Sequence, residues 1–114
     1  MFDMNYIIKI ARTEFQLEIT HYPRVVEAFK KHVKGKNFVT PHVIGYVEIS
    51  PVKGMIVELS QGESFFDGAT VFGVTVMSNQ GHDYDLSRSF TDVRKALAYI
   101  KSLKIGCEKM EGRE

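Results

Sequence analysis

Short connections between strand-like segments constrain the fold of this chain more than any other feature of its sequence. Segments 43–49, 55–59 and 70–77 are apolar and rich in β-branched residues, as expected of strands. Pro51 and Gly54 stand between the first two segments, where they suit a tight turn. Parallel neighbours need a crossover of a dozen residues or more, so these connections favour antiparallel pairing.

The first twenty residues predict a second hairpin. Residues 14–20 alternate strictly between polar and apolar side chains, a pattern typical of a strand with one solvent-exposed face. Residues 5–10 are rich in isoleucine, and residues 11–13 then connect the two strands. A helix over residues 2–11 is the alternative that the same segment leaves open.

Two segments have the spacing of amphipathic helices. Pro23 suits the first position of a helix, and Gly35 suits its end. Ser89 or Thr91 is expected to cap the final helix, and residues 104–114 carry little apolar content and are expected to fray. The apolar positions of the two helices are Val25, Val26, Phe29 and Val33 in the first, and Phe90, Val93, Leu97, Ile100 and Leu103 in the second.

Residues 60–68 contain two glycines and several polar side chains, and predict a loop. A turn at residues 79–81 and a short strand at 82–86 complete the expected order, ββ-α-βββ(β)-α. We therefore expect an α+β fold with an antiparallel sheet of four to six strands and two helices packed on one face. The 114 residues suit one compact domain, 1–103, followed by a flexible tail, 104–114.

Composition excludes several classes of protein. No apolar run approaches the ~18 residues of a membrane helix, so we expect neither a membrane span nor a secretory signal. Cys107 is the only cysteine, so the chain forms no internal disulfide and no cysteine-type zinc site. These observations predict a cytoplasmic protein without a cofactor.

The net charge is only +1, yet the charges are unevenly distributed. Residues 21–53 contain six basic and two acidic side chains, whereas residues 58–92 contain one basic and six acidic ones. The basic segment is interpreted either as a solvated helix face or as a nucleic-acid-binding patch that contacts phosphates. The residues of that patch are Arg24, Lys30, Lys31, Lys34 and Lys36.

The acidic segment contains a loop with two adjacent phenylalanines, Phe65 and Phe66. Adjacent side chains on an extended chain point in opposite directions, so one ring is expected to stay exposed unless both anchor the loop to the core. An exposed aromatic beside acidic groups suits a protein partner with a basic, grooved surface. The predicted partner-binding residues are Phe65, Phe66, Asp67, Asp83 and Asp85.

No sequence motif indicates catalysis. The chain has no G-x-S-x-G and no phosphate-binding glycine motif, and its histidines lack the spacing of a zinc site. The segment His82-Asp83-Tyr84-Asp85 is the densest polar cluster, and a metal there would need further ligands from Asp67 or His42. A plain polar turn or edge strand is the simpler interpretation, and an enzyme whose site assembles from Asp67, His82, Asp83 and Asp85 is a third class of hypothesis.

Taken together, the sequence favours a non-enzymatic, cytoplasmic binding module that acts through contact with another protein as a regulator, adaptor or inhibitor. The specific function is not determined by the sequence. Self-association into a homodimer is compatible with the oppositely charged segments. The alternative is a nucleic-acid-binding protein that uses residues 24–36, and we expect no catalytic residue, metal or membrane contact.

Overall fold

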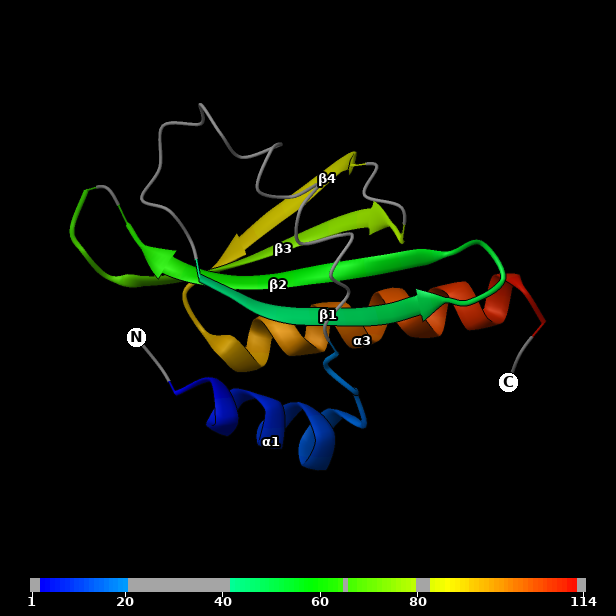
Figure 1. Ribbon diagram of the computed structural model, residues 1–114, viewed down its shortest axis with the longest axis horizontal. Helices are drawn as coiled ribbons and strands as arrows, with labels where there is room; N and C mark the ends of the chain where they lie inside the picture. The colour runs from blue at the N-terminus through cyan, green and yellow to red at the C-terminus, as the bar shows by residue number, and fades with distance from the viewer. Residues whose placement is uncertain (1–2, 21–41, 65, 80–82, 113–114) are drawn as a thin grey trace.

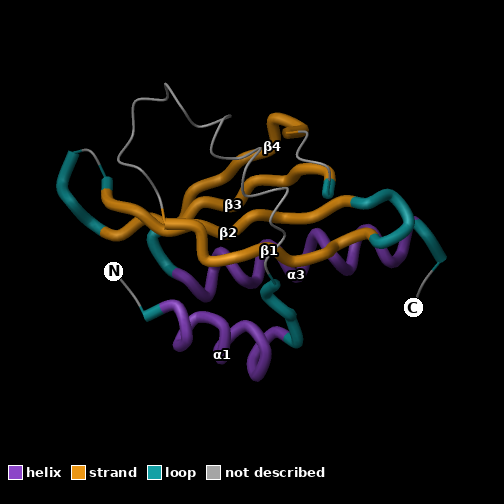
Figure 2. Tube along the Cα trace, viewed as in Figure 1, coloured by secondary structure: helices purple, strands orange, loops and turns teal. Residues whose placement is uncertain are grey.

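A four-stranded antiparallel sheet and two helices make up the part of the chain that the computed structural model describes, residues 3–20, 42–64, 66–79 and 83–112. The sheet order follows the sequence, β1-β2-β3-β4 (Figures 1 and 2). The elements are α1 (Met4–Phe15), β1 (His42–Ser50), β2 (Met55–Glu63), β3 (Thr70–Ser78), β4 (Asp83–Phe90) and α3 (Val93–Met110). The expected α+β class with antiparallel strands is confirmed, whereas the expected order is wrong, because a helix precedes the first strand.

The helices cover one face of the sheet and share one apolar core with it. Figure 1 shows α3 running beneath the strands and α1 beside it. α3 contacts β1 most extensively, and α1 packs against α3. The largest buried side chains of this core are Ile7, Leu17, Ile44, Ile49, Leu59, Phe72, Leu97 and Ile100.

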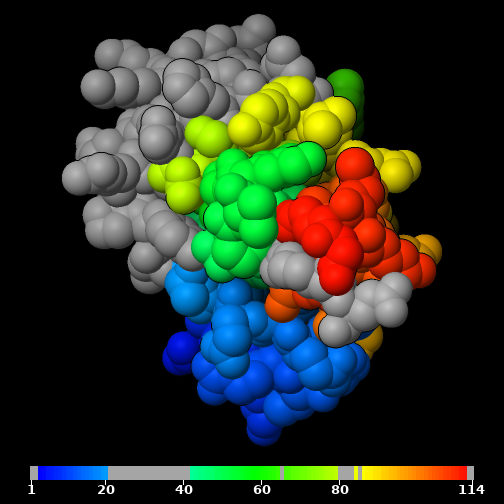
Figure 3. Space-filling model, turned by 90° about the vertical axis from the view of Figure 1, so that its right-hand side faces the viewer, coloured from blue at the N-terminus to red at the C-terminus, as the bar shows by residue number. Residues whose placement is uncertain are grey.

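Polar contacts fasten both ends of α3. At its start, the guanidinium of Arg94 pairs with the Glu14 carboxylate at 3.0 Å, which joins the end of α1 to α3 and lowers the pKa of Glu14. At its end, the Ser50 hydroxyl donates to Glu111 at 2.6 Å and accepts from the backbone N–H of Lys53 at 3.1 Å. Figure 3 shows the last turns of α3 against the β1–β2 turn on this side of the molecule.

The predicted N-terminal hairpin over residues 5–10 and 14–20 is wrong, because residues 4–15 form α1. Asp3 caps this helix by accepting from the N–H of Asn5 at 2.8 Å. Ile7, Ile10 and Ala11 fall at helical spacing and are buried on one face. The alternative prediction, a helix over residues 2–11, agrees with the structure in type, although α1 extends to Phe15.

The alternating residues after α1 form no strand, and Gln16, the first of them, is left-handed with a φ of 54°. The N–H of Leu17 donates to the carbonyl of Ala11 at 2.9 Å, closing the helix end. Leu17 is buried and Glu18 is exposed, so the alternation reflects which side chains reach the core. Thr20 then exchanges two backbone hydrogen bonds of 2.8 Å with Tyr46, an isolated bridge on the outer edge of β1.

The predicted turn between residues 49 and 55 and the strand over 70–77 are confirmed as the β1–β2 connection and β3. Residues 60–63 belong to β2 rather than to a loop, because Ser60 to Glu63 pair in register with β3. β4 is longer than the predicted strand over 82–86. The expected helix at residues 23–34 lies outside the described residues.

Three predictions about the final helix are corrected. Its N-cap is Asp92, which accepts from the N–H of Arg94 at 2.9 Å, rather than Ser89 or Thr91. Phe90 ends β4 but still reaches the helix, since its ring lies 5.5 Å from that of Tyr99. α3 also continues through Met110, so residues 104–110 are helical where a frayed tail was expected.

A pair of glycine substitutions tests how the segment after α1 packs on β1. A Cβ at Gly45 would overlap the Ile19 side chain and lie 3.0 Å from the Thr20 carbonyl oxygen. We expect Gly45→Ala to lower the free energy of unfolding by about 1–3 kcal/mol. Gly106, in α3, has open space around it, and Gly106→Ala is expected to raise the free energy by up to about 1 kcal/mol.

Denaturant unfolding of both variants measures these changes. An unchanged or stabilised Gly45→Ala variant would contradict the close approach of Ile19 to β1.

Candidate functional site

The described residues of the β2–β3 connection, Ser64 and residues 66–69, form a hairpin tip with backbone hydrogen bonds of its own. The N–H of Ser64 donates to the Ala69 carbonyl at 2.7 Å, and the N–H of Gly68 donates to the Ser64 carbonyl at 3.0 Å. Gly68 has a φ of 70°, a left-handed conformation that glycine adopts without steric cost. The hairpin therefore projects a defined loop beyond the end of β4 (Figure 1).

Two polar side chains at the hairpin tip support its backbone. The Ser64 hydroxyl accepts from the N–H of Phe66 at 3.3 Å, and the Asp67 carboxylate accepts from the N–H of Ala69 at 3.0 Å. The hydrogen bond from Ala69, and then one from the Ser64 side chain, lower the pKa of Asp67. Asp67 is thus a carboxylate at neutral pH and serves as an Asx-turn residue.

Phe66 is the most exposed large apolar residue of the described chain. Its side chain is 99% exposed, although its backbone N–H is hydrogen-bonded within the hairpin tip. Glu63 at the end of β2 and Asp67 are also exposed. The hairpin tip therefore presents one aromatic ring with two carboxylates beside it in the sequence.

The other predicted partner-binding residues lie elsewhere. Asp83 and Asp85 belong to the start of β4, and Asp83 pairs with Met77. Thr70, next to the hairpin tip, is seven positions from Met77 along β3, a span of about 23 Å. Phe66 and Asp67 therefore lie at the opposite end of β3 from the β4 aspartates, and a contact surface that includes both groups stays a prediction, while Phe65 lies outside the described residues.

The same register separates the residues of the enzyme hypothesis. Asp67 and Asp83 stand at opposite ends of β3, too far apart to act on one reacting group. His42 begins β1 and is exposed, and His82 lies outside the described residues. No group of three or more histidine, cysteine or acidic residues within the described ranges is arranged to hold a metal ion.

The basic patch of the nucleic-acid hypothesis, Arg24 to Lys36, also lies outside the described residues, so it stays a prediction from the sequence. Within the described ranges, neither helix is both long and apolar enough to cross a membrane.

The sheet face opposite α3 carries a buried polar pair that sequence reasoning missed. Tyr46 on β1 and Glu58 on β2 are directly opposite in the register, and both are buried. Burial, and then the charge of Glu58, raise the pKa of the Tyr46 hydroxyl far above its usual range. The interruption of the apolar run 55–59 by one glutamate was the only signal of this pair in the sequence.

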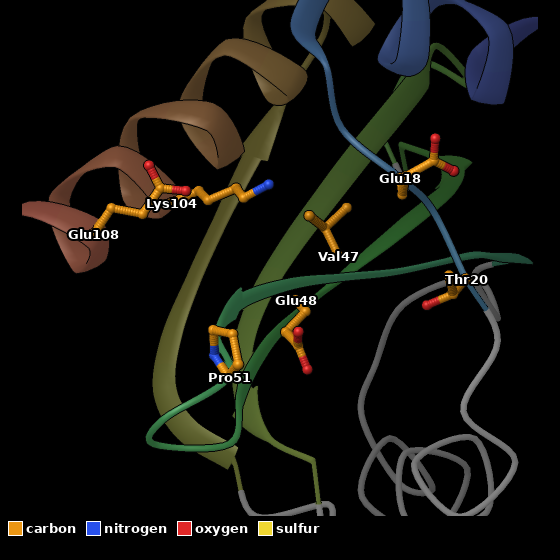
Figure 4. Close-up of a pocket in the computed structure, with 7 residues that line it drawn as sticks. All are labelled: Glu18, Thr20, Val47, Glu48, Pro51, Lys104 and Glu108. Carbon is orange, nitrogen blue, oxygen red and sulfur yellow. The ribbon is translucent and has the colours of Figure 1, made fainter. Parts of the chain in front are cut away.

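A pocket of about 350 Å³ lies between β1, the segment after α1 and the last turns of α3. Figure 4 shows Lys104 reaching from α3 toward β1 across this pocket. Glu18 at its rim is already paired with Arg12 at 3.1 Å. The pocket is lined by Glu18, Thr20, Val47, Glu48, Pro51, Lys104 and Glu108.

Comparison of the chain with models of protein families, with curated proteins and with solved structures finds no match. The arguments about function therefore start from the geometry of the described residues alone.

Substitution of Tyr46 tests the environment of the buried pair. Because the pKa of Tyr46 is raised in the folded chain, its proton is held there while an unfolded tyrosine ionises near pH 10.0. Stability is therefore expected to fall as the pH rises above about 10. Tyr46→Phe should remove this contribution and flatten the fall.

Denaturant unfolding between neutral pH and about pH 11 measures this slope. Tyr84→Phe, which alters an exposed phenol, is the matched control and should keep the slope of the unaltered chain. An equal slope in the Tyr46→Phe variant would show that the Tyr46 hydroxyl ionises as readily folded as unfolded.

Proposed function

We propose that this chain is a non-enzymatic protein-binding module that contacts its partner through Phe66 at the hairpin tip. The observation that carries the proposal is a fully exposed phenylalanine at a hairpin tip whose described residues are joined by hydrogen bonds. A loop that is already ordered loses little conformational entropy when it binds. The ring therefore acts as an anchor residue for a pocket on another protein.

The hairpin tip also defines the chemistry of the partner. Transfer of one phenylalanine side chain from water to an apolar pocket contributes about 1.5–3 kcal/mol. Glu63 and Asp67 flank the ring in sequence and are exposed, so basic groups around that pocket would complement them. The same carboxylates disfavour an anionic lipid surface as the target. We therefore propose a protein partner with an aromatic-sized pocket and a basic rim.

A matched pair of variants tests this proposal. Val52 is 74% exposed on the β1–β2 turn, at the other end of β2, and so offers a comparable apolar side chain far from the hairpin tip. Partners captured by the unaltered chain should bind Phe66→Ser at least about tenfold more weakly, and Val52→Ser equally well. The readout is the dissociation constant of each captured protein, measured with the purified variants.

Two outcomes contradict the proposal. Equal affinity of the Phe66→Ser and Val52→Ser variants would exclude the ring as an anchor. Salt-sensitive binding to labelled duplex DNA, single-stranded DNA or RNA, measured by anisotropy at about 50 mM and about 200 mM salt, would instead support the alternative function of residues 24–36.

A further inference from the structure

Two carboxylates stand near Phe66 in the sequence, but they differ in their contacts with the hairpin tip. The Asp67 carboxylate accepts from the N–H of Ala69 at 3.0 Å. The Glu63 carboxylate has no hydrogen bond or ion pair with another residue of the described ranges, and the backbone of Glu63 pairs with Thr70 in the β2–β3 register. The two acidic residues therefore differ in what they can do for the ring.

The contacts of Asp67 reach Phe66 through Ser64. The Ser64 hydroxyl donates to the Asp67 carboxylate and accepts from the N–H of Phe66 at 3.3 Å. A hydroxyl has one hydrogen and two lone pairs, so it can make both hydrogen bonds at once. The carboxylate thus sets the direction of the hydroxyl that holds the backbone of Phe66.

The position of Phe66 depends on such hydrogen bonds, because its ring is 99% exposed and gains little from packing. The backbone hydrogen bond from Gly68 to the Ser64 carbonyl spans the same residues at 3.0 Å. A loop that must be ordered when it binds loses conformational entropy at that step, whereas a loop already held in place loses less. Removal of a contact that orders the tip is therefore expected to weaken binding without any change in the ring itself.

We propose that Asp67 is a positioning residue, which acts on the partner by holding Phe66 in place through Ser64 and Ala69, whereas Glu63 acts through its charge alone. This inference rests on the proposed function of Phe66 as the anchor. Asparagine accepts the same hydrogen bonds and favours the same turn as aspartate, and alanine does neither. Asp67→Asn should therefore preserve the position of Phe66, and Asp67→Ala should not.

Backbone relaxation of ¹⁵N in the full chain, without a partner, tests this assignment. The order parameter of the Phe66 N–H should be near the rigid-backbone value of about 0.85 in the unaltered chain and in Asp67→Asn. Asp67→Ala should lower it to about 0.6 or less, the range of flexible backbone. Glu63→Ala is the matched control and should leave it unchanged. The amide resonances of α3 verify that each variant is folded.

The dissociation constants of the proteins captured in the Phe66→Ser experiment separate position from charge. Glu63→Gln and Asp67→Asn each remove one charge, and should weaken binding by similar factors that shrink as salt is added. Asp67→Ala should bind at least about fivefold more weakly than Asp67→Asn at low and at high salt, because its loop must be ordered on binding.

An order parameter of Phe66 in Asp67→Ala equal to that of the unaltered chain would overturn the proposal. Equal loss of order in Glu63→Ala would also overturn it, because Asp67 would then have no special part in the tip. Equal loss in Asp67→Asn and Asp67→Ala would show that charge, rather than hydrogen-bond acceptance, orders the loop. The relaxation measurement needs no partner, so failure of this proposal is distinguishable from failure of the proposed function, which Phe66→Ser decides.

Discussion

Burial of one sheet face against α3 is the interaction on which the rest of the structure depends. Val57 and Leu59 of β2 and Val74 of β3 lie fully buried in the same core as Leu97 and Ile100 of α3. Side chains alternate between the faces of a strand, so a shift of β2 by one residue would turn its valine and leucine away from α3. This packing therefore fixes the register of the central strands, and with it the position of the β2–β3 hairpin tip.

The opposite face of the sheet is buried as well, and this burial explains why the strands are apolar along their length. Tyr46, Ile56 and Met77 are at most 2% exposed and lie outside the core that contains α3. Strands buried on both faces appear as continuous apolar runs rather than as alternating patterns. The runs 43–49 and 55–59 have this form, so the pairing of β1 with β2 was predictable from β-branched content and the turn residues between them.

The helix α1 was not predictable in the same way. Ile7, Ile8 and Ile10 fit a strand by composition, and helical spacing appears only when Ala11 is counted with the isoleucines. Asp3 gave a capping signal that was overlooked, and it decides where the helix begins. The alternation over residues 14–20 predicted a strand, but residues 14 and 15 end α1 and Gln16 is left-handed; pairing is a long-range property, and in this segment only Thr20 has a partner on β1.

The candidate site shows the same division between local and long-range information. The sequence left open whether one ring of the Phe65-Phe66 pair is exposed or both anchor the loop to the core, and in the structure Phe66 is exposed. The separation of Phe66 from Asp83 and Asp85 was not visible in the sequence, because the β3–β4 register decides which end of the sheet those residues occupy. Charge composition alone carried no information about that register.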